Sequence, residues 1–514
     1  MLKYSLKRFG STIIVLFGAT LLCFPLLSWV GDPLEDLRYD TDPNAEFLMQ
    51  QRIDFLGLDD PWYVRYWDWL SGVLGCLDPT NTVLGECDFG TSIGGSNVTD
   101  MIVNAAAMSL RLVLVATLIS IVLGIGIGII SAIRQYSTFD YFTSFIIFLF
   151  WSLPPFVAAI IGKEYLAIQY NNWMGDPRFS AGNILLMAII LAIAVPIVMG
   201  GSTARRVITG SIMFVYTCTV MPLLDHMHFM EHPRIGPIGL LVLGLMLAVG
   251  LTALISGLKN RRVLYVALGV VAAAMISYYA TWELLRQIPG GYLLLIGLFV
   301  LTIALCVIGA RLFGGYAKGQ ATVVAVVTGV LMSALILLDH YMYSWPGLLS
   351  AKPRPVRTIG AETPNLQGDW WIHSLDHITQ LWIPSLAMAL MSIATYTRYT
   401  RASMLEVNKQ DYIRTARAKG VEERTVVLKH AFRNSLIPLA TIVAFDFASL
   451  IGGSIIVERV FGWNAMGQML ITGIQNADPA PVMAVVVFTG FISVLFNFFA
   501  DLIYGVLDPR IRVS

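Results

Sequence analysis

The residues whose types and spacing predict a specific chemistry lie in one basic segment, 398–438, and that chemistry is binding. Its centre reads Asp411-Tyr-Ile-Arg-Thr-Ala-Arg-Ala-Lys-Gly420. Tyr412 and Ala416 share one face of a predicted helix, and Gly420 is typical of the residue that ends a helix. A short basic helix of this kind suits docking on a partner or on a membrane surface.

A second helix is predicted directly after this one. Leu428 and Phe432 give it an apolar face, and Pro438 is expected to open the next apolar run. Together the two pieces predict a helical hairpin. The alternative is a solvated basic loop on the inner side of a membrane.

No cluster of residues in the sequence predicts catalysis. The sequence Gly-x-x-x-x-Gly-Lys-Ser/Thr does not occur, so the chain lacks the phosphate cradle that ATP binding requires. Two polar clusters, Asp339 with His340 and His373 with Asp376 and His377, are expected at outer ends of apolar runs, where polar residues are common. The five cysteines have no metal-binding spacing. The sequence therefore predicts no enzyme, no metal centre and no resident cofactor.

The elements that must position these residues are membrane spans. The chain has 514 residues, of which 56% are hydrophobic and 13% charged, and its mean hydropathy is +0.71. Such a composition is typical of a protein embedded in lipid. Apolar runs of about 20 residues, enough to cross a hydrocarbon core, recur along the chain. Twelve spans are expected, near 9–30, 107–132, 141–162, 183–203, 207–223, 236–257, 263–283, 291–310, 321–341, 380–399, 438–457 and 481–505.

Basic residues in alternate connections predict the orientation. The first apolar run is longer than a signal-peptide core and lacks a cleavage site, so it is expected to remain as a signal anchor. Segment 398–433 holds nine Lys and Arg against four Asp and Glu, and the C-terminal tail carries Arg510 and Arg512. By the positive-inside rule both termini are cytoplasmic and the protein is multi-pass. The exceptions to this rule are basic residues in connections expected on the outer side, at Arg234, Arg286 and 352–357.

A few residues inside or between the spans stand out. Arg111 and Asp446 are costly at membrane depth unless they face water or a partner, so they either line a translocation path or lie shallower than expected. Pro154 and Pro155 predict a kink in the third span. Cys76 and Cys87 lie in a polar outer loop, and the sequence leaves open whether they form a disulfide or stay as two free thiols.

Arg414-Thr415-Ala416 followed by Gly420 resembles the EAA loop of ABC importer permeases, in the form of the peptide (peptide/nickel) branch. Arg in place of the acidic first residue and a long gap from Gly420 to Pro438 are both typical of that branch. Further stretches resemble the same family and cover about 1–165 and 375–514 in order: Gly31-Asp32-Pro33, Leu56-Gly57-Leu58-Asp59, 88–92, Glu458-Arg-Val-Phe-Gly-Trp-Asn-Ala-Met-Gly467 and 501–512.

The resemblance implies a permease subunit of an ATP-driven importer of peptides, in the bacterial cytoplasmic (inner) membrane. It implies partners: a second homologous permease, two P-loop ATPase subunits that hold the ATP and Mg, an extracytoplasmic solute-binding protein, the peptide and the lipid, with no nucleic acid. It also implies coupling to the ATPase through Asp411, Tyr412, Arg414, Thr415, Ala416, Arg417, Ala418, Lys419 and Gly420. The substrate could be a dipeptide, a longer peptide, glutathione or a nickel chelate.

The expected fold is all-α, with a six-span type I importer core split by about six inserted spans. The core parts are 1–165 and 376–514, and the inserted region with an outer loop is 166–375. The insertion is either an accessory domain or a lineage-specific stabilising element. Two other functions stay open: a twelve-span secondary transporter, although halves 1–257 and 258–514 show no repeat, and a non-transporting membrane scaffold.

Overall fold

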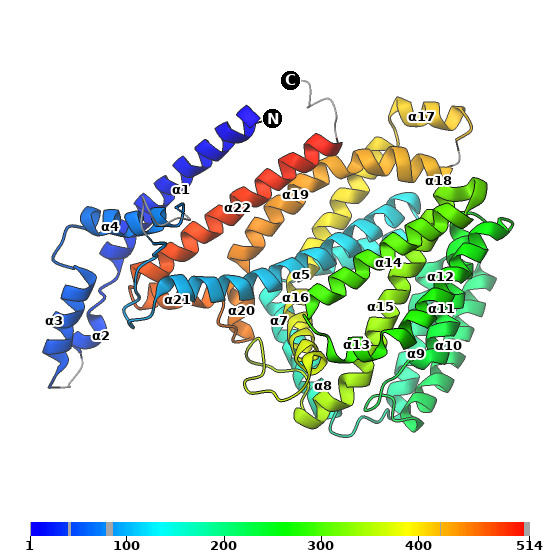
Figure 1. Cartoon of the computed structure of the whole chain (residues 1–514), viewed down its shortest axis with the longest axis horizontal. Coiled ribbons are helices and arrows are strands. Elements are labelled where there is room, and N and C mark those ends of the chain that lie inside the picture. Colours follow the sequence, from blue (N-terminus) through cyan, green and yellow to red (C-terminus); the bar gives the residue numbers. More distant parts are fainter. Residues whose placement is uncertain (1, 40–42, 79–85, 422, 508–514) are drawn as a thin grey trace.

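The fold is all-α, as the sequence predicts. The computed structural model describes residues 2–39, 43–78, 86–421 and 423–507, and within these ranges it contains helices and no strand (Figure 1). One isolated bridge pairs Thr91 with Asn97. Long helices are the form in which an apolar chain satisfies its own backbone hydrogen bonds in lipid.

The described part contains ten helices that are long and apolar enough to span a membrane. A bent helix pair adds an eleventh candidate, and the N-terminal helix α1 (Leu2–Val30) has a shorter apolar stretch at Ile13–Trp29. If the bent pair and α1 each cross once, the total equals the twelve spans expected from the sequence.

Two long helices, α5 (Val98–Ile133) and α16 (Trp370–Val407), form the centre of the core. They approach closely because α5 presents glycines to α16. A Cβ added at Gly124 would lie 2.7 Å from Tyr396 Cβ, and one added at Gly128 would lie 2.7 Å from Thr400 Cβ. Small residues at helix contacts are how membrane helices gain close packing. The helices α19 (Phe432–Gly453) and α22 (Pro479–Leu507) pack together beside this pair.

The third span is broken rather than kinked. Helix α6 (Thr138–Ser152) ends before the two prolines, and α7 (Pro155–Gly162) continues through a π-helical turn (Lys163–Ile168) into α8 (Gln169–Trp173). The two parts meet at 98°. Pro154 is extended, with ψ of 142°, and Pro155 starts the new helix, where its missing N–H costs nothing.

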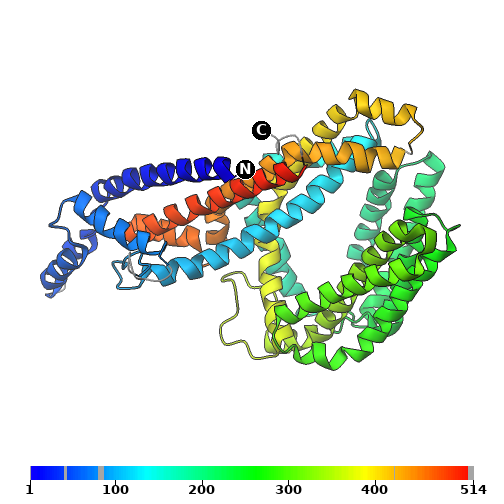
Figure 2. The same cartoon turned by 45° about the horizontal axis from the view of Figure 1, so that its top comes forward.

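A separate group of helices lies between the two core parts of the chain. It consists of a hairpin, α9 (Ala181–Met199) with α10 (Thr203–His226), and a bundle of α11 (Gly236–Ile255), α12 (Arg261–Ala280), α13 (Trp282–Gln287), α14 (Tyr292–Phe313) and α15 (Lys318–Ala351). In the bundle α11, α12 and α14 all pack on α15. Figure 2 shows the bundle inclined away from the core helices. It meets α16 where Trp371 packs among Leu240, Tyr278 and Ile336.

The two segments that connect this group of helices to the core meet at one residue pair. The side-chain amide of Asn171, in α8, donates to Val356 O at 2.5 Å and accepts from Val356 N at 3.1 Å. The chain therefore leaves the core after α8 and returns to the same place after α15. This return to one place is compatible with the insertion that the sequence predicts, which stays a prediction.

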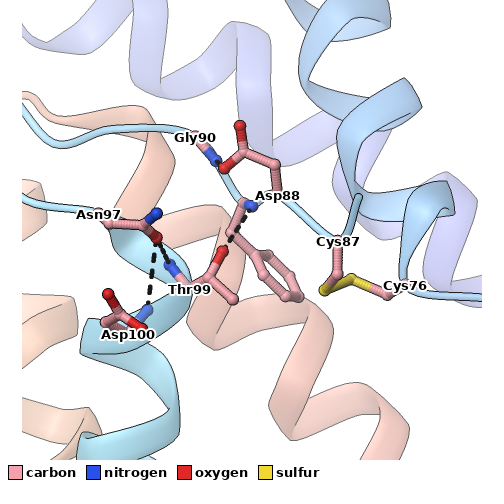
Figure 3. The surroundings of a disulfide bond; sticks show 8 residues. Cys76, Cys87, Asp88, Gly90, Asn97, Thr99 and Asp100 are labelled. Carbon is pink, nitrogen blue, oxygen red and sulfur yellow. Dashed lines mark hydrogen bonds between the residues drawn. A yellow bond between two sulfur atoms is a disulfide. The ribbon is translucent and has the colours of Figure 1, made fainter. Parts of the chain in front are cut away.

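Short helices cover the end of the core opposite the termini of the chain: α2 (Glu35–Arg38), α3 (Ala45–Leu56), α4 (Trp62–Gly75), α20 (Ile455–Val460) and α21 (Met466–Gln475). Two aromatic residues of α4 serve packing, because Tyr66 and Trp69 are buried against Phe24 of α1 and Met483 of α22. A disulfide joins Cys76 and Cys87 (Figure 3). It lies beside the start of α5, whose cap residue Asn97 accepts from Thr99 N at 2.8 Å.

Candidate functional site

The predicted coupling residues form a separate exposed helix, α17 (Asp411–Ala418). Figure 1 shows α17 standing at the edge of the molecule, toward the side where α1 begins and α22 ends. Its end is a Schellman motif, since Gly420 N donates to Arg417 O at 2.9 Å and Val421 N to Ala416 O at 3.2 Å. Gly420 has a φ of +75°, a conformation that favours glycine, and a Cβ there would meet nothing within 4 Å.

One buried side chain fixes α17 to the core. Ile413 is fully buried and packs with Ala132 at the end of α5, Met404 of α16 and Val426 of the π-helical segment Val426–Ala431. It therefore joins α17 to three core elements at once. The sequence-based set of coupling residues omitted Ile413. Its only sequence signal is that it is the one large aliphatic residue in a polar helix, and its partners are distant in sequence.

The remaining surface of α17 is open to a partner. Arg414, Thr415, Ala418 and Lys419 are exposed, and Tyr412 is 44% exposed. Two contacts hold the helix in place without covering this surface. Arg417 makes a bidentate pair with Glu423, at 3.0 and 2.7 Å, and Asn434 Nδ2 donates to Tyr412 Oη at 2.8 Å. The Arg417 guanidinium lowers the pKa of the Glu423 carboxyl, so this pair stays charged at neutral pH.

The second piece of the predicted hairpin differs from expectation. Helix α18 (Glu423–Thr425) runs through Val426–Ala431 directly into α19, so the piece is the first part of a long helix and not a separate one. Pro438 lies inside α19 instead of opening it. A π-helical turn precedes this proline, and such turns and buried neighbours allow proline within membrane helices. The side chain of Leu428 lies outside the described part.

A buried ion pair joins the base of this region to the core. Arg401 Nη2 of α16 donates to Asp140 Oδ2 at 2.8 Å, and the Asp140 side chain is only 4% exposed. Asp140 also accepts from Ser131 Oγ of α5 and, at 3.1 Å, from Tyr136 N. A buried charge needs this degree of pairing. The ends of α5, α6 and α16 are thus held together next to α17.

Arg111 and Asp446 do not contact each other in the described part of the chain. Each contacts α16 instead. Arg111 Nη1 is 3.4 Å from His377 Nδ1, and the half-buried Asp446 accepts from Tyr396 Oη at 2.7 Å. The structure therefore gives each residue a partner but does not bring them together in one site.

The stretch Glu458–Gly467 has a structural explanation that the sequence alone did not give. Glu458 is fully buried, and its Oε1 accepts from Ser109 Oγ and Ser454 Oγ, both at 2.7 Å, while Oε2 accepts from Gly467 N at 2.8 Å. A Cβ at Gly467 would lie 2.6 Å from Glu458 Oε2. This network fixes α20 and α21 on the first turns of α5.

The polar clusters flagged as non-catalytic are packed into the structure. Asp339 accepts from Gly236 N at 2.8 Å at the start of α11 and from Tyr278 Oη at 2.9 Å. Asp376 accepts from Lys352 Nζ at 2.8 Å and from both donors of Thr363. Both carboxylates thus hold connecting segments in place.

The comparisons with known proteins agree with this architecture. Residues 323–513 match the family model described as "Binding-protein-dependent transport system inner membrane component". The match begins within α15, the last helix of the segment assigned to the insertion.

Curated relatives are permease proteins. Over 155 residues the chain is 44% identical to the oligopeptide transport system permease protein OppB of Mycobacterium tuberculosis and 41% identical to AppB, of the same description, from Bacillus subtilis. It is 40% identical over 149 residues to the glutathione transport system permease protein GsiC of Pectobacterium atrosepticum. These matches cover 30%, 30% and 29% of this chain and 48%, 48% and 46% of the relatives, so the chain spans about half the length of the curated relatives it matches.

From residue 323 onward, this multi-pass membrane protein is therefore similar to the inner membrane components of binding-protein-dependent transport systems, and over about 150 residues it is similar to oligopeptide and glutathione permease proteins.

Proposed function

We propose that the chain is the transmembrane permease subunit of an ATP-driven importer that carries peptides across a bacterial cytoplasmic membrane. The single observation that supports this most is α17. It is an exposed basic helix within the segment that matches the transport-family model, and it is anchored by Ile413 to three core elements. Such a helix can pass movement of a docked partner to the membrane helices. The relatives whose names include peptide or glutathione transport support the substrate class.

The coupling residues of the proposal are those of α17 and its end, Asp411–Gly420. A P-loop ATPase dimer binds ATP and Mg and receives α17, and a second permease completes the path. An extracytoplasmic binding protein delivers the peptide to the opposite side. On this arrangement both termini are cytoplasmic, and the support for this is that α1 begins and α22 ends toward the α17 side of the molecule (Figure 1). Arg111 and Asp446 are candidates for the path through their contacts with α16.

The first experiment is purification of the tagged chain in mild detergent, identification of co-purifying subunits and measurement of ATP hydrolysis with and without peptides. We expect a second permease, a P-loop ATPase and hydrolysis that responds to peptide. A lone chain without ATPase, whose transport follows an ion gradient, would instead indicate a secondary transporter. A chain that carries no substrate at all would indicate a scaffold.

The substitution Gly420→Arg tests the role of α17 in coupling. An Arg strains the left-handed backbone at this position and adds bulk to the docking end of α17, so the variant should reach the membrane but import peptide poorly. Gly420→Asn is the matched control, because Asn tolerates the same backbone conformation. Normal import by Gly420→Arg would contradict the role of α17.

A further inference from the structure

A groove of 620 Å³ lies in the bundle of α11 to α15, between α12 and α14, and residues of α15 also line it. Its α12 wall runs from Arg262 to Ser277, and at about 1.5 Å per residue this wall is about 22 Å long. Half of a hydrocarbon core of about 30 Å is about 15 Å. The groove is therefore long enough for one acyl chain of a single leaflet.

The groove is open on both walls. Gly269 of α12 and Gly309 of α14 line it, and a Cβ added at either glycine would meet nothing within 4 Å. Gly269 and Ala273 are also exposed. Both walls are helices long and apolar enough to span a membrane, so the solvent around this opening is lipid. Empty space loses van der Waals contacts, so an acyl chain fills such a groove unless protein covers it.

One end of the groove carries a fixed guanidinium. Arg262 lines the groove at the start of α12, and Phe313 lines it at the end of α14. A Cβ at Gly315 would clash with Arg262 Nη1, so the guanidinium lies against the turn between α14 and α15. Its Cζ is also 5.8 Å from the ring centroid of the exposed Tyr316. These contacts hold the positive charge at the end of the apolar groove.

The surroundings of Arg262 are basic and contain no acid. The connections 256–262 and 311–318 hold five basic residues and no Asp or Glu: Lys259, Arg261, Arg262, Arg311 and Lys318. All five are exposed, and within the described ranges none of them forms an ion pair. The positive-inside rule explains basic connections, but it does not explain a guanidinium held at the end of a groove. Since a guanidinium matches phosphate in shape and charge, this end complements an anionic headgroup.

This end of the bundle lies on the same side of the membrane as α17. Arg134 Nη1, at the end of α5, donates to Val198 O at 2.9 Å, so α9 ends beside the residues that anchor α17. The next two helices, α10 and α11, are each long and apolar enough to cross once, which returns the chain to that side at 256–262. The basic end therefore faces the headgroups of the leaflet on the α17 side.

We propose that this groove binds an anionic phospholipid, with one acyl chain along Gly269 and Gly309 and the phosphate on Arg262. The inference goes beyond the proposed function and does not rest on it, because it concerns the bundle and the lipid around it. The phosphate accepts charge-assisted hydrogen bonds from the guanidinium. The four neighbouring basic residues attract a headgroup of net negative charge more strongly than a zwitterionic one.

The test is photo-crosslinking of the full chain, with the subunits that co-purify with it, in phosphatidylcholine nanodiscs. Two lipids are compared at the same low mole fraction, phosphatidylglycerol and phosphatidylcholine, each with a diazirine at the same position of one acyl chain. We expect the label in the peptides that contain Gly269 or Gly309. Labelling by phosphatidylglycerol should be about tenfold stronger than labelling by phosphatidylcholine.

Two pairs of variants separate the roles of the groove and of the charge. Gly309→Leu should remove the label, because the new side chain fills the open space, whereas Gly297→Leu should keep it. Gly297 is the matched control, since it lies on the same helix outside the groove and a Cβ there also meets nothing within 4 Å. Arg262→Ala should reduce the preference for phosphatidylglycerol severalfold. Arg286→Ala, at the other end of the bundle, should leave it unchanged.

Equal labelling by the two lipids in the wild type would overturn the inference, and so would label spread evenly over the lipid-facing helices. A groove that is labelled in the isolated chain but not in the complex would also overturn it, since a protein partner would then cover the groove. If Gly309→Leu does not elute as a single species in detergent, the comparison of the two lipids on the wild type decides alone.

Discussion

At the scale of single residues, the chain places its most consequential side chains where two or more helices end together. Ile413 links α17 to α5, α16 and the start of α19, and Asp478 links α21 to the loop before α5. Neither residue belonged to the set that the sequence suggested. Both act through partners distant in sequence, which only the folded chain brings near.

Shortening Ile413 should uncouple transport from ATP hydrolysis. Ile413→Ala leaves a cavity at the base of α17, and such a change in a packed site costs about 2–5 kcal/mol. We expect the variant to retain its ATPase partners but to import fewer peptides for each ATP hydrolysed, measured in reconstituted vesicles. Ile413→Val, which removes one methylene group, should keep most of the coupling. Equal ratios of peptide to ATP in all three proteins would show that Ile413 transmits nothing.

Asp478 should make the stability of the protein depend on pH. Burial raises the pKa of this carboxyl. The folded protein therefore binds the proton more tightly than the unfolded chain. The stability that this tighter proton binding contributes is fully present below the pKa of Asp in the unfolded chain, about 3.9. It is lost as the pH rises through the higher pKa of Asp478 in the folded protein. Asp478 lines two cavities, and the other charged residues that line them are Asp32, Glu35, Asp36, Arg52, Arg65, Asp68 and Asp88.

Asp478→Asn removes this dependence. Its Tm in detergent should exceed that of the wild type at pH 7.5, and the difference should shrink toward pH 4. Glu46→Gln, which changes an exposed acid of α3, is the control and should follow the wild type at both pH values. A difference that grows on acidification would mean that the wild-type carboxylate is stabilised in its charged form, and the assigned sign would be wrong.

At the scale of elements, the contact between α5 and α16 organises the core. Gly128→Ala should disrupt it, because the new Cβ would lie 2.7 Å from Thr400 Cβ and 2.9 Å from Thr397 O. Overpacking of this kind costs about 1–3 kcal/mol. Gly126→Ala is a close control on the same helix, since a Cβ there meets nothing within 4 Å. Thermal unfolding should separate the two variants, and equal Tm values would show that α5 can move away from α16 without cost.

Much of the element order could be predicted from the sequence, because apolar run length and the placement of Lys and Arg record the crossings of a membrane. The helix at Asp411–Ala418 and its glycine end also followed from local signals. The continuous helix through Pro438 could not be predicted, since proline usually interrupts a helix and the compensating π-turn depends on neighbours. The role of Glu458 was equally hidden, because Ser109 and Gly467 reach it from separate elements.

At the scale of the whole molecule, the two ends of the segment that holds the additional helices meet at Asn171 and Val356. Replacing residues 176–351 by Gly-Ser-Gly-Ser should leave a folded core, because Asn171 and Val356 remain to bridge the junction and Lys352 remains to pair with the buried Asp376. We expect the shortened chain to elute as a single species in detergent and to co-purify with the ATPase.

Trp371→Ala is the control for this excision, since it removes the main core side chain in the contact with the bundle while the insertion stays. A shortened chain that aggregates although Trp371→Ala is well behaved would show that the core needs the insertion to fold.

The junction also has a consequence for biogenesis. Because the chain returns to the point it left, an even number of helices must enter the bilayer between Asn171 and Val356 during synthesis. The least apolar of the candidate spans between these residues is α10, whose first turn carries Arg205 and Arg206. A ribosome-bound chain that failed to insert α10 would emerge with every later segment inverted. On the proposed arrangement α17 would then face away from its ATPase partner, so the insertion of the hairpin of α9 with α10 would decide whether the finished protein can assemble.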